Sequence, residues 1–183
     1  VGSKQAACTT CGQRLEDCTG HFGHVKLVLP VFHAGYHRHM HQVLSCVCKQ
    51  CGRLLLGPEE CDRALRRLRR PTMEELRRTL FHKRLVEMCK KVRHCPHCAA
   101  YNGGVRKGPG VPLMFKHAVG PSKNTPEEVA SAFQESFRDA RASNRDLEPL
   151  VDKACEDVSP LAAYHLLKQM SPLDRELLGV VQP

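Results

Sequence analysis

The sequence predicts a mixed fold that is mainly α-helical, with a few short β elements. Helix-start signals recur along the chain, and apolar residues at helical spacing follow them. Two groups of cysteine and histidine residues have the spacing of metal ligands, within turns that are too rich in glycine and cysteine for long helices. Aromatic residues make up only 5% of the chain and Trp is absent. We therefore expect aliphatic packing and bound metal to supply much of the stability.

The first group lies near the start of the chain, where Cys8-x-x-Cys11 is followed by Cys18-x-x-His21. Structural Zn²⁺ takes four tetrahedral ligands, and a Cys-x-x-Cys turn lets two thiolates bind one ion from a short loop. The order of the residues predicts a Cys₃His zinc site. His24 is an alternative to His21, which we prefer because it repeats the two-residue spacing.

The second group combines Cys48-x-x-Cys51 with Cys95-x-x-Cys98. Cys46 is an alternative ligand to Cys48, but only Cys48 forms the Cys-x-x-Cys spacing with Cys51. Each group supplies four ligands and leaves no coordination position for water or substrate, which is typical of structural zinc and not of catalytic zinc. The sequence therefore predicts two structural zinc ions.

The 11 cysteines bear on the compartment in which the protein works. The Cys-x-x-Cys spacing, the odd count and the lack of a signal-peptide pattern favour a reduced, intracellular compartment over disulfide pairing. The longest apolar stretch, Val25–Phe32, contains Lys26 and Pro30, so we expect no membrane span. Since the chain lacks an initiator Met and stops just after a helical pattern, we expect it to be an internal piece of a longer polypeptide. Four cysteines are expected to be buried thiols without metal: Cys46, Cys61, Cys89 and Cys155.

The segment after the first group predicts a strand and then a helix. Residues 25–30 form a short apolar run that ends at a proline, which predicts a strand. Residues 31–46 predict a helix from the spacing of Tyr36, Met40, Val43 and Leu44. We expect the histidines of this helix to face different directions, as packing or solvated side chains: His37, His39 and His41.

Two further helices are predicted between the halves of the second group. Pro58, with two glutamates after it, is a strong helix start, and Pro71 ends this helix. Thr72 and Glu75 form a capping box that predicts the second helix, with a break near Phe81. The predicted inward residues are Cys61, Ala64, Leu65 and Leu68 in the first helix, and Leu76, Leu80, Leu85, Met88, Cys89 and Val92 in the second. A hairpin of this kind returns the chain to its start, so distant cysteines can share one ion.

The second half of the chain predicts a loop or ribbon and then helices. Residues 101–123 are rich in Gly, Pro and Lys. Thr125 and Glu128 form a capping box, with Pro126 at the first helical position. The inward face of this helix would contain Val129, Ala132, Phe133, Phe137 and Ala140. A shorter helix is expected over 147–155, and helices after Ser159-Pro160 and Ser171-Pro172 would point Leu161, Leu167, Met170, Leu173 and Leu177 inward.

The net charge of +9, from 28 Lys and Arg against 19 Asp and Glu, is compatible with nucleic-acid binding. The basic residues concentrate between Arg63 and Arg93, whereas residues 127–156 are mixed and slightly acidic. One basic set lies on the first helix of the hairpin, where it either contacts phosphates or pairs with acids of a neighbouring subunit. Candidate phosphate contacts are Arg63, Arg66, Arg67 and Arg70, with Arg106 and Lys107 in the later loop.

Motifs for catalysis are absent from the sequence. It contains no Walker loop, no Gly-x-Ser-x-Gly and no His-Glu-x-x-His, and no aspartate cluster that would hold catalytic Mg²⁺. We predict no catalytic residue in this chain.

The first cysteine group and the residues after it resemble one known family. Cys8-Thr-Thr-Cys11, then Cys18-Thr-Gly-His21-Phe-Gly-His, an apolar run and Pro-Val-Phe-His33, is similar to the N-terminal clamp of the largest subunit of multisubunit RNA polymerases. Cys95-Pro-His-Cys98 and the following Asn-Gly-Gly-Val-Arg-Lys look most like eukaryotic DNA-directed RNA polymerase III. Archaeal or other nuclear polymerases are the nearest alternatives, and a free-standing zinc-knuckle adaptor is the alternative of another class.

The resemblance implies a nuclear nucleotidyltransferase that makes small untranslated RNAs, including transfer RNA and 5S ribosomal RNA. It implies a clamp that closes over the DNA template and the DNA–RNA hybrid, and contacts with other polymerase subunits. Mg²⁺ is expected only in the catalytic part of the family, which lies outside this chain. On this basis we expect a zinc-binding clamp core with an intervening helical pair over 1–108, a loop or linker over 109–124 and a helical clamp segment over 125–183.

Overall fold

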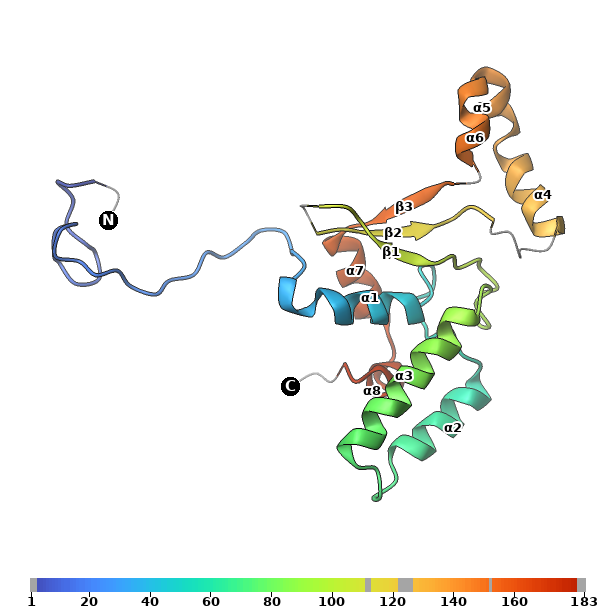
Figure 1. Cartoon of the computed structure of the whole chain (residues 1–183), viewed down its shortest axis with the longest axis horizontal. Helices are drawn as coiled ribbons and strands as arrows, with labels where there is room; N and C mark the ends of the chain where they lie inside the picture. Colours follow the sequence, from blue (N-terminus) through green and yellow to red (C-terminus); the bar gives the residue numbers. More distant parts are fainter. Residues whose placement is uncertain (1–2, 111–112, 122–126, 152, 181–183) are drawn as a thin grey trace.

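The structure, a computed structural model, describes residues 3–110, 113–121, 127–151 and 153–180. An amino-terminal loop stands apart at the end of an extended segment, and the other described residues form helices and a small sheet (Figure 1). The prediction of a mainly helical fold with short β elements is confirmed. Among the described residues, no helix has both the length and the apolar character that crossing a bilayer requires.

The prediction of a strand over residues 25–30 is wrong. This segment is extended but pairs with no described strand, and its apolar side chains are exposed, Val28 fully (99%) and Leu29 by 64%. Figure 1 shows it running free between the amino-terminal loop and the first helix. A strand needs a neighbour for its backbone hydrogen bonds, and none of the described segments provides one.

The first helix, α1 (His37–Cys46), follows a 3₁₀ turn, η1 (Ala34–Tyr36). The helix prediction is confirmed from His37 onward, with Val43 and Leu44 buried and Tyr36 exposed. The expectation that its histidines face different directions is wrong for His37 and His41, because residues four apart share a helix face. It holds for His39, which is exposed. His37 and His41 both stack on the ring of Phe115, at centroid distances of 4.4 and 6.0 Å.

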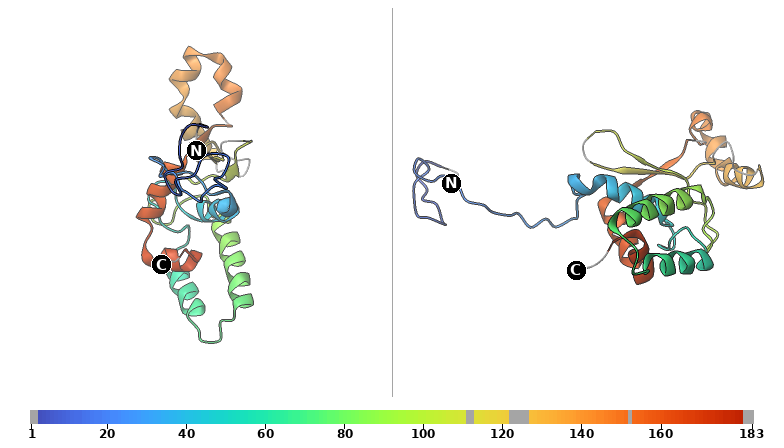
Figure 2. Two further views of the ribbon diagram at one scale, coloured as in Figure 1. Left: turned by 90° about the vertical axis from the view of Figure 1, so that its left-hand side faces the viewer. Right: turned by 60° about the horizontal axis from the view of Figure 1, so that its bottom comes forward.

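Helices α2 (Pro58–Leu68) and α3 (Glu75–Lys91) form the predicted hairpin (Figure 2). The α2 prediction is confirmed, including Pro58 in the first turn and Leu65 and Leu68 in the core. Helix α3 differs in its start, since its N-cap is Glu74 and no side chain caps it. The predicted Thr72 capping box is therefore wrong. The predicted break near Phe81 is also wrong, because α3 is continuous through this residue.

The buried face of α3 also differs from the predicted one. Leu85 and Cys89 are buried as predicted, and Phe81 is buried with them. The other predicted inward residues Leu76, Leu80 and Met88 are 70%, 52% and 46% exposed, so that part of the prediction is wrong. The sequence of α3 offers two apolar stripes, and the packing of α3 on α1 selects one of them. Helical periodicity alone does not decide which stripe faces a partner.

The sheet contains three antiparallel strands in the order β1 (Val105–Lys107), β2 (Phe115–Ala118) and β3 (Cys155–Val158). Strands β1 and β2 form the ribbon expected within 101–123, and β2 lies in the segment 109–124. The fully buried Phe115 is opposite Val158 and packs with Leu44 and Ala163. Cys155 begins β3 and is exposed, so its prediction as a buried thiol in a helix is wrong.

Four short helical elements connect β2 to β3: α4 (Glu127–Ser136), α5 (Arg138–Ser143), η2 (Arg145–Leu147) and α6 (Glu148–Val151). The predicted helix start at Thr125-Pro126 lies outside the described residues. The predicted continuous helix is divided at Phe137, the N-cap of α5. In Figure 1 these elements form a lobe away from the α2–α3 hairpin.

The last two helices, α7 (Pro160–Gln169) and α8 (Pro172–Leu178), begin where predicted. Ser159 and Ser171 cap them by accepting hydrogen bonds from backbone N–H groups at 3.2 and 3.1 Å. Met170 and Leu177 are buried as expected, whereas Leu161 and Leu173 are 44% and 48% exposed, which corrects the prediction.

Candidate metal centres

The first candidate centre lies in the amino-terminal loop. The ligand atoms of Cys8, Cys11, Cys18 and His21 all lie within 4.8 Å of one another, and His24 is outside this group. His21 Nε2 is 3.5 Å from Cys18 Sγ. This arrangement offers three thiolates and one imidazole to one ion, which is the donor set of a structural Cys₃His zinc site.

The backbone of the first turn favours thiolate at Cys8. Backbone N–H groups of Cys11 and Thr10 donate to its sulfur, and these hydrogen bonds lower the pKa of Cys8 to about 6. Because Zn²⁺ binds the deprotonated thiol, a lowered pKa reduces the cost of losing the proton. The backbone of this turn therefore favours Cys8 as a thiolate ligand.

The second candidate centre joins two turns that are far apart in sequence. The sulfur atoms of Cys48, Cys51, Cys95 and Cys98 lie within 4.8 Å of one another. Cys48 Sγ is 3.7 Å from Cys98 Sγ, and Cys51 Sγ is 3.6 Å from Cys95 Sγ. Tetrahedral zinc with Zn–S bonds of about 2.3 Å places its sulfurs about 3.8 Å apart. The donor set and spacing of this group therefore fit one zinc ion.

Three Cys-x-x-Cys turns share one backbone pattern. In each, the residue after the second cysteine donates its N–H to the carbonyl of the first, at 2.7 Å for Gly12, 3.1 Å for Gly52 and 2.9 Å for Ala99. The same three residues have positive φ, +72°, +69° and +59°. Glycine adopts this conformation without strain, whereas Ala99 does not. Ala99 is thus the least favourable of the three turn residues.

The fold brings the two halves of the second centre together. Cys48 follows α1 directly, and Cys95 follows α3, which packs on α1. Each turn is closed by an isolated antiparallel bridge, Val47 with Leu54 and His94 with Tyr101. The α2–α3 hairpin therefore begins and ends at the same metal group.

Cys46 lies outside the second group. It is fully buried and lies in the same core cluster as Cys89 of α3. Burial of Cys46 and Cys89 agrees with the sequence prediction, and Cys61 is partly buried. The structure thus places Cys48, and not Cys46, with the other three sulfurs.

Asn102 supports the second centre, and we did not predict this role. Its side chain is buried (2% exposed) and donates through Nδ2 to Cys48 Sγ at 3.3 Å and to the Ala100 carbonyl at 3.1 Å. Its Oδ1 accepts the Lys49 N–H at 2.9 Å. Burial raises the pKa of Cys48, but N–H donors from Cys51 and Asn102 outweigh it, and the pKa falls to about 6. The sequence signal was a short amide residue just after a Cys-x-x-Cys turn.

The predicted basic contacts lie on separate elements. Arg63, Arg66 and Arg67 are exposed on α2, and Arg70 is exposed just beyond the end of that helix. Arg106 and Lys107 are exposed on the edge strand β1. Arg67 and Arg70 line a hollow between α2 and α3, which Arg63 and Arg66 do not line.

Comparisons with known proteins agree on one family. The family model described as RNA polymerase Rpb1, domain 1, matches residues 1–183. The RNA polymerase III subunit RPC1 of Debaryomyces hansenii is 41% identical over 98% of this chain and 13% of its own length. The corresponding subunit of Schizosaccharomyces pombe is 39% identical over 98% of this chain and 13% of its own length. The subunit of Homo sapiens is 35% identical over 97% of this chain and 13% of its own length. The chain therefore spans about 13% of the length of these relatives.

Proposed function

Because the chain belongs to the family of RNA polymerase largest subunits, as its domain 1, we propose that it forms the zinc-braced base of the clamp of RNA polymerase III. The polymerase would synthesise transfer RNA, 5S ribosomal RNA and other small untranslated RNAs in the nucleus. This chain would help to hold the DNA template and the DNA–RNA hybrid, in contact with other polymerase subunits. The observation that carries the proposal is similarity over nearly the whole chain to RPC1 subunits from several eukaryotes.

The role we propose for the second zinc ion is mechanical. When bound, zinc supplies four strong bonds and no open position for a reactant. Cys48 and Cys51 lie at the start of the α2–α3 hairpin and Cys95 and Cys98 lie just after its end, so the ion would fix the base of the hairpin. His97 adds a second link, since its Nε2 lies 3.0 Å from the Leu56 carbonyl oxygen. A hairpin held in this way can transmit movement as one rigid arm.

Contacts with nucleic acid are proposed for those of the predicted basic residues that do not line the hollow between α2 and α3: Arg63, Arg66, Arg106 and Lys107. Each would neutralise backbone phosphates and release counterions, which adds affinity without sequence preference. Mg²⁺-dependent nucleotide addition would take place in the catalytic part of the subunit, outside this chain. Our proposal for this chain is therefore retention of DNA and not chemistry.

A chimeric subunit tests the assignment of this chain to RNA polymerase III. RPC1 of Saccharomyces cerevisiae is 39% identical over 98% of this chain, and its matching segment would be replaced by residues 1–183. We expect the chimera to support synthesis of transfer RNA and 5S RNA precursors, measured by pulse labelling. A chimeric subunit that assembles into polymerase III but leaves these precursors absent would contradict the proposal. The human RPC1 segment serves as the matched control.

A further inference from the structure

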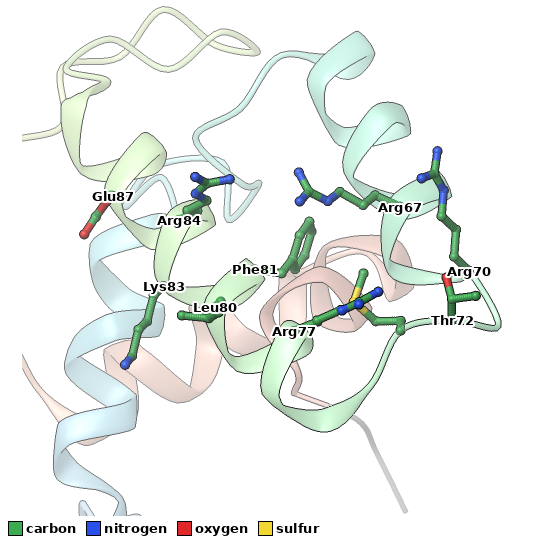
Figure 3. Close-up of a pocket in the computed structure, with 10 residues that line it drawn as sticks. Arg67, Arg70, Thr72, Arg77, Leu80, Phe81, Lys83, Arg84 and Glu87 are labelled. Atoms are coloured by element: carbon green, nitrogen blue, oxygen red, sulfur yellow. The ribbon is translucent and has the colours of Figure 1, made fainter.

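A basic hollow of about 550 Å³ lies between α2, α3 and the turn that joins them. Figure 3 shows Arg67 and Arg84 extending from opposite helices above the ring of Phe81, with Arg77 across the opening toward Thr72. Glu87 is the one acidic residue of the lining and lies at its edge (Figure 3). The lining contains five cations: Arg67, Arg70, Arg77, Lys83 and Arg84.

These cations lack acidic partners within the described part of the chain. None of the five takes part in an ion pair or a side-chain hydrogen bond there. The neighbouring Arg69 contrasts with them, because its guanidinium makes two hydrogen bonds to Glu176 at 2.7 and 2.8 Å. The charge of the hollow is therefore not neutralised by the described residues and favours an anionic occupant.

The floor of the hollow is apolar and continues into an exposed apolar stripe. Met73, Leu80 and Phe81 contribute to the lining. Leu80 lies one turn from Leu76 on the same face of α3, and Met88 lies two turns beyond Leu80. All three are exposed, by 52%, 70% and 46% respectively. Leu76 and Leu80 therefore form one exposed apolar patch, and Lys83 and Arg84 separate it from Met88. Exposed apolar patches of this kind mark protein interaction sites.

We propose that the α2–α3 hollow binds an acidic peptide segment of a partner protein, with an apolar side chain of that segment on the Leu80–Phe81 floor. Acidic side chains complement the five cations, and an apolar anchor complements the floor and the stripe. Nucleic acid fits less well, because duplex phosphates present a convex polar surface that leaves the apolar floor uncovered. This inference goes beyond the role in holding DNA, since it assigns part of the basic surface to a protein partner.

The test uses the full-length subunit in the complex with which it purifies. The probe is a short fluorescein-labelled peptide, Asp-Glu-Leu-Phe-Asp-Glu, and a second peptide has Ser in place of Leu and Phe. Binding is measured by fluorescence anisotropy, which does not depend on transcription. We compare the triple variant Arg67→Gln, Arg77→Gln, Arg84→Gln with the double variant Arg63→Gln, Arg66→Gln, whose positions are exposed on α2 outside the hollow.

We expect the triple variant to weaken binding of the probe by about tenfold or more, on the basis of exposed ion pairs. Leu80→Ser should weaken it by about fivefold and remove the preference over the Ser peptide. The double variant should bind as the wild type does. Equal weakening by the double variant, or no preference between the peptides in the wild type, would overturn the proposal.

A photocrosslink at the floor separates protein from nucleic acid. Leu80 would be replaced by p-benzoylphenylalanine, and the complex irradiated with either the labelled peptide or a short duplex DNA. Crosslinking from the p-benzoylphenylalanine at this position to the peptide, lost when the substitutions of the triple variant are added, is the expected result. Crosslinking to DNA and not to the peptide would overturn the proposal and assign the hollow to nucleic acid.

Discussion

Replacing Asn102 by Ala is predicted to weaken the second metal centre without touching a ligand. The substitution removes two hydrogen bonds donated by Nδ2 and one accepted by Oδ1, at 3.3, 3.1 and 2.9 Å. It leaves the Lys49 N–H without the partner that it has in the fold. At about 1 kcal/mol for each lost bond in a buried site, the free energy of unfolding should fall by about 3 kcal/mol.

Zinc affinity at this centre should fall as well. Loss of a hydrogen bond behind a ligand typically weakens metal binding by about 10- to 100-fold. The pKa of Cys48 should rise, because the Asn102 side chain is one of the donors that lower it. Zinc binding by the variant should therefore require a higher pH than binding by the wild type.

The assay is competition for zinc with a chromophoric chelator, together with urea unfolding followed by circular dichroism. The variant should release one zinc ion at a lower chelator concentration than the wild type and retain the other. Tyr101→Phe is the matched control, since it removes only a 3.4 Å hydrogen bond to the Gly120 carbonyl at a neighbouring position. The reasoning is refuted if Asn102→Ala keeps wild-type zinc affinity, or if Tyr101→Phe is equally weakened.

Four further predictions follow from other parts of the structure. Cys95→Ser should lose one zinc by elemental analysis while Cys46→Ser keeps both, and the opposite pattern would make Cys46 the ligand. In urea unfolding, Ala99→Gly should raise the free energy of unfolding by about 0.5–1 kcal/mol, because relief of the positive φ outweighs the entropy of the added glycine. Gly52→Ala should lower the free energy of unfolding, since the new Cβ would lie 2.9 Å from Gln169 Cβ. Burial lowers the pKa of His117 from 6.5 to about 4, so the unfolded state binds the proton more tightly than the folded state. The contribution of His117 to the free energy of unfolding is therefore fully present above pH 6.5 and is lost as the pH falls toward 4. Unfolding at a series of pH values should show a smaller loss in His117→Gln. In the assembled polymerase, Arg63→Gln with Arg66→Gln should reduce the log–log salt slope of DNA binding by about 0.9 for each lost phosphate contact, and an unchanged slope with impaired assembly would place them at a subunit interface.

Local signals in the sequence predicted the parts of the fold that depend on near neighbours. Pro58, Ser159 and Ser171 mark helix starts because their chemistry acts within one turn, and these helices begin where predicted. The cysteine spacing likewise identified the two groups that the structure brings together. The choice of His21 over His24 rested on the same local spacing.

Features that depend on distant partners were not predictable in the same way. The apolar run over 25–30 has the composition of a strand, but none of the described strands pairs with it. On α3, the sequence offers two apolar stripes, and the core cluster formed with distant segments buries Phe81 and Leu85 while leaving Leu80 exposed. Cys155 was assigned to a helix because its pairing with Ala118 across the sheet is long-range. The role of Asn102 is also long-range, since Cys48 is 54 residues away in sequence.

The central claim is that two closed zinc sites brace this chain, and X-ray absorption at the zinc edge tests it most directly. The measurement gives the type and number of donor atoms, and elemental analysis of the same reduced sample gives the metal content. The account predicts two zinc ions in each chain, with about seven sulfur donors to one nitrogen donor over both sites, and Zn–S distances of about 2.3 Å. One zinc or none, or a spectrum dominated by oxygen and nitrogen donors, would contradict it.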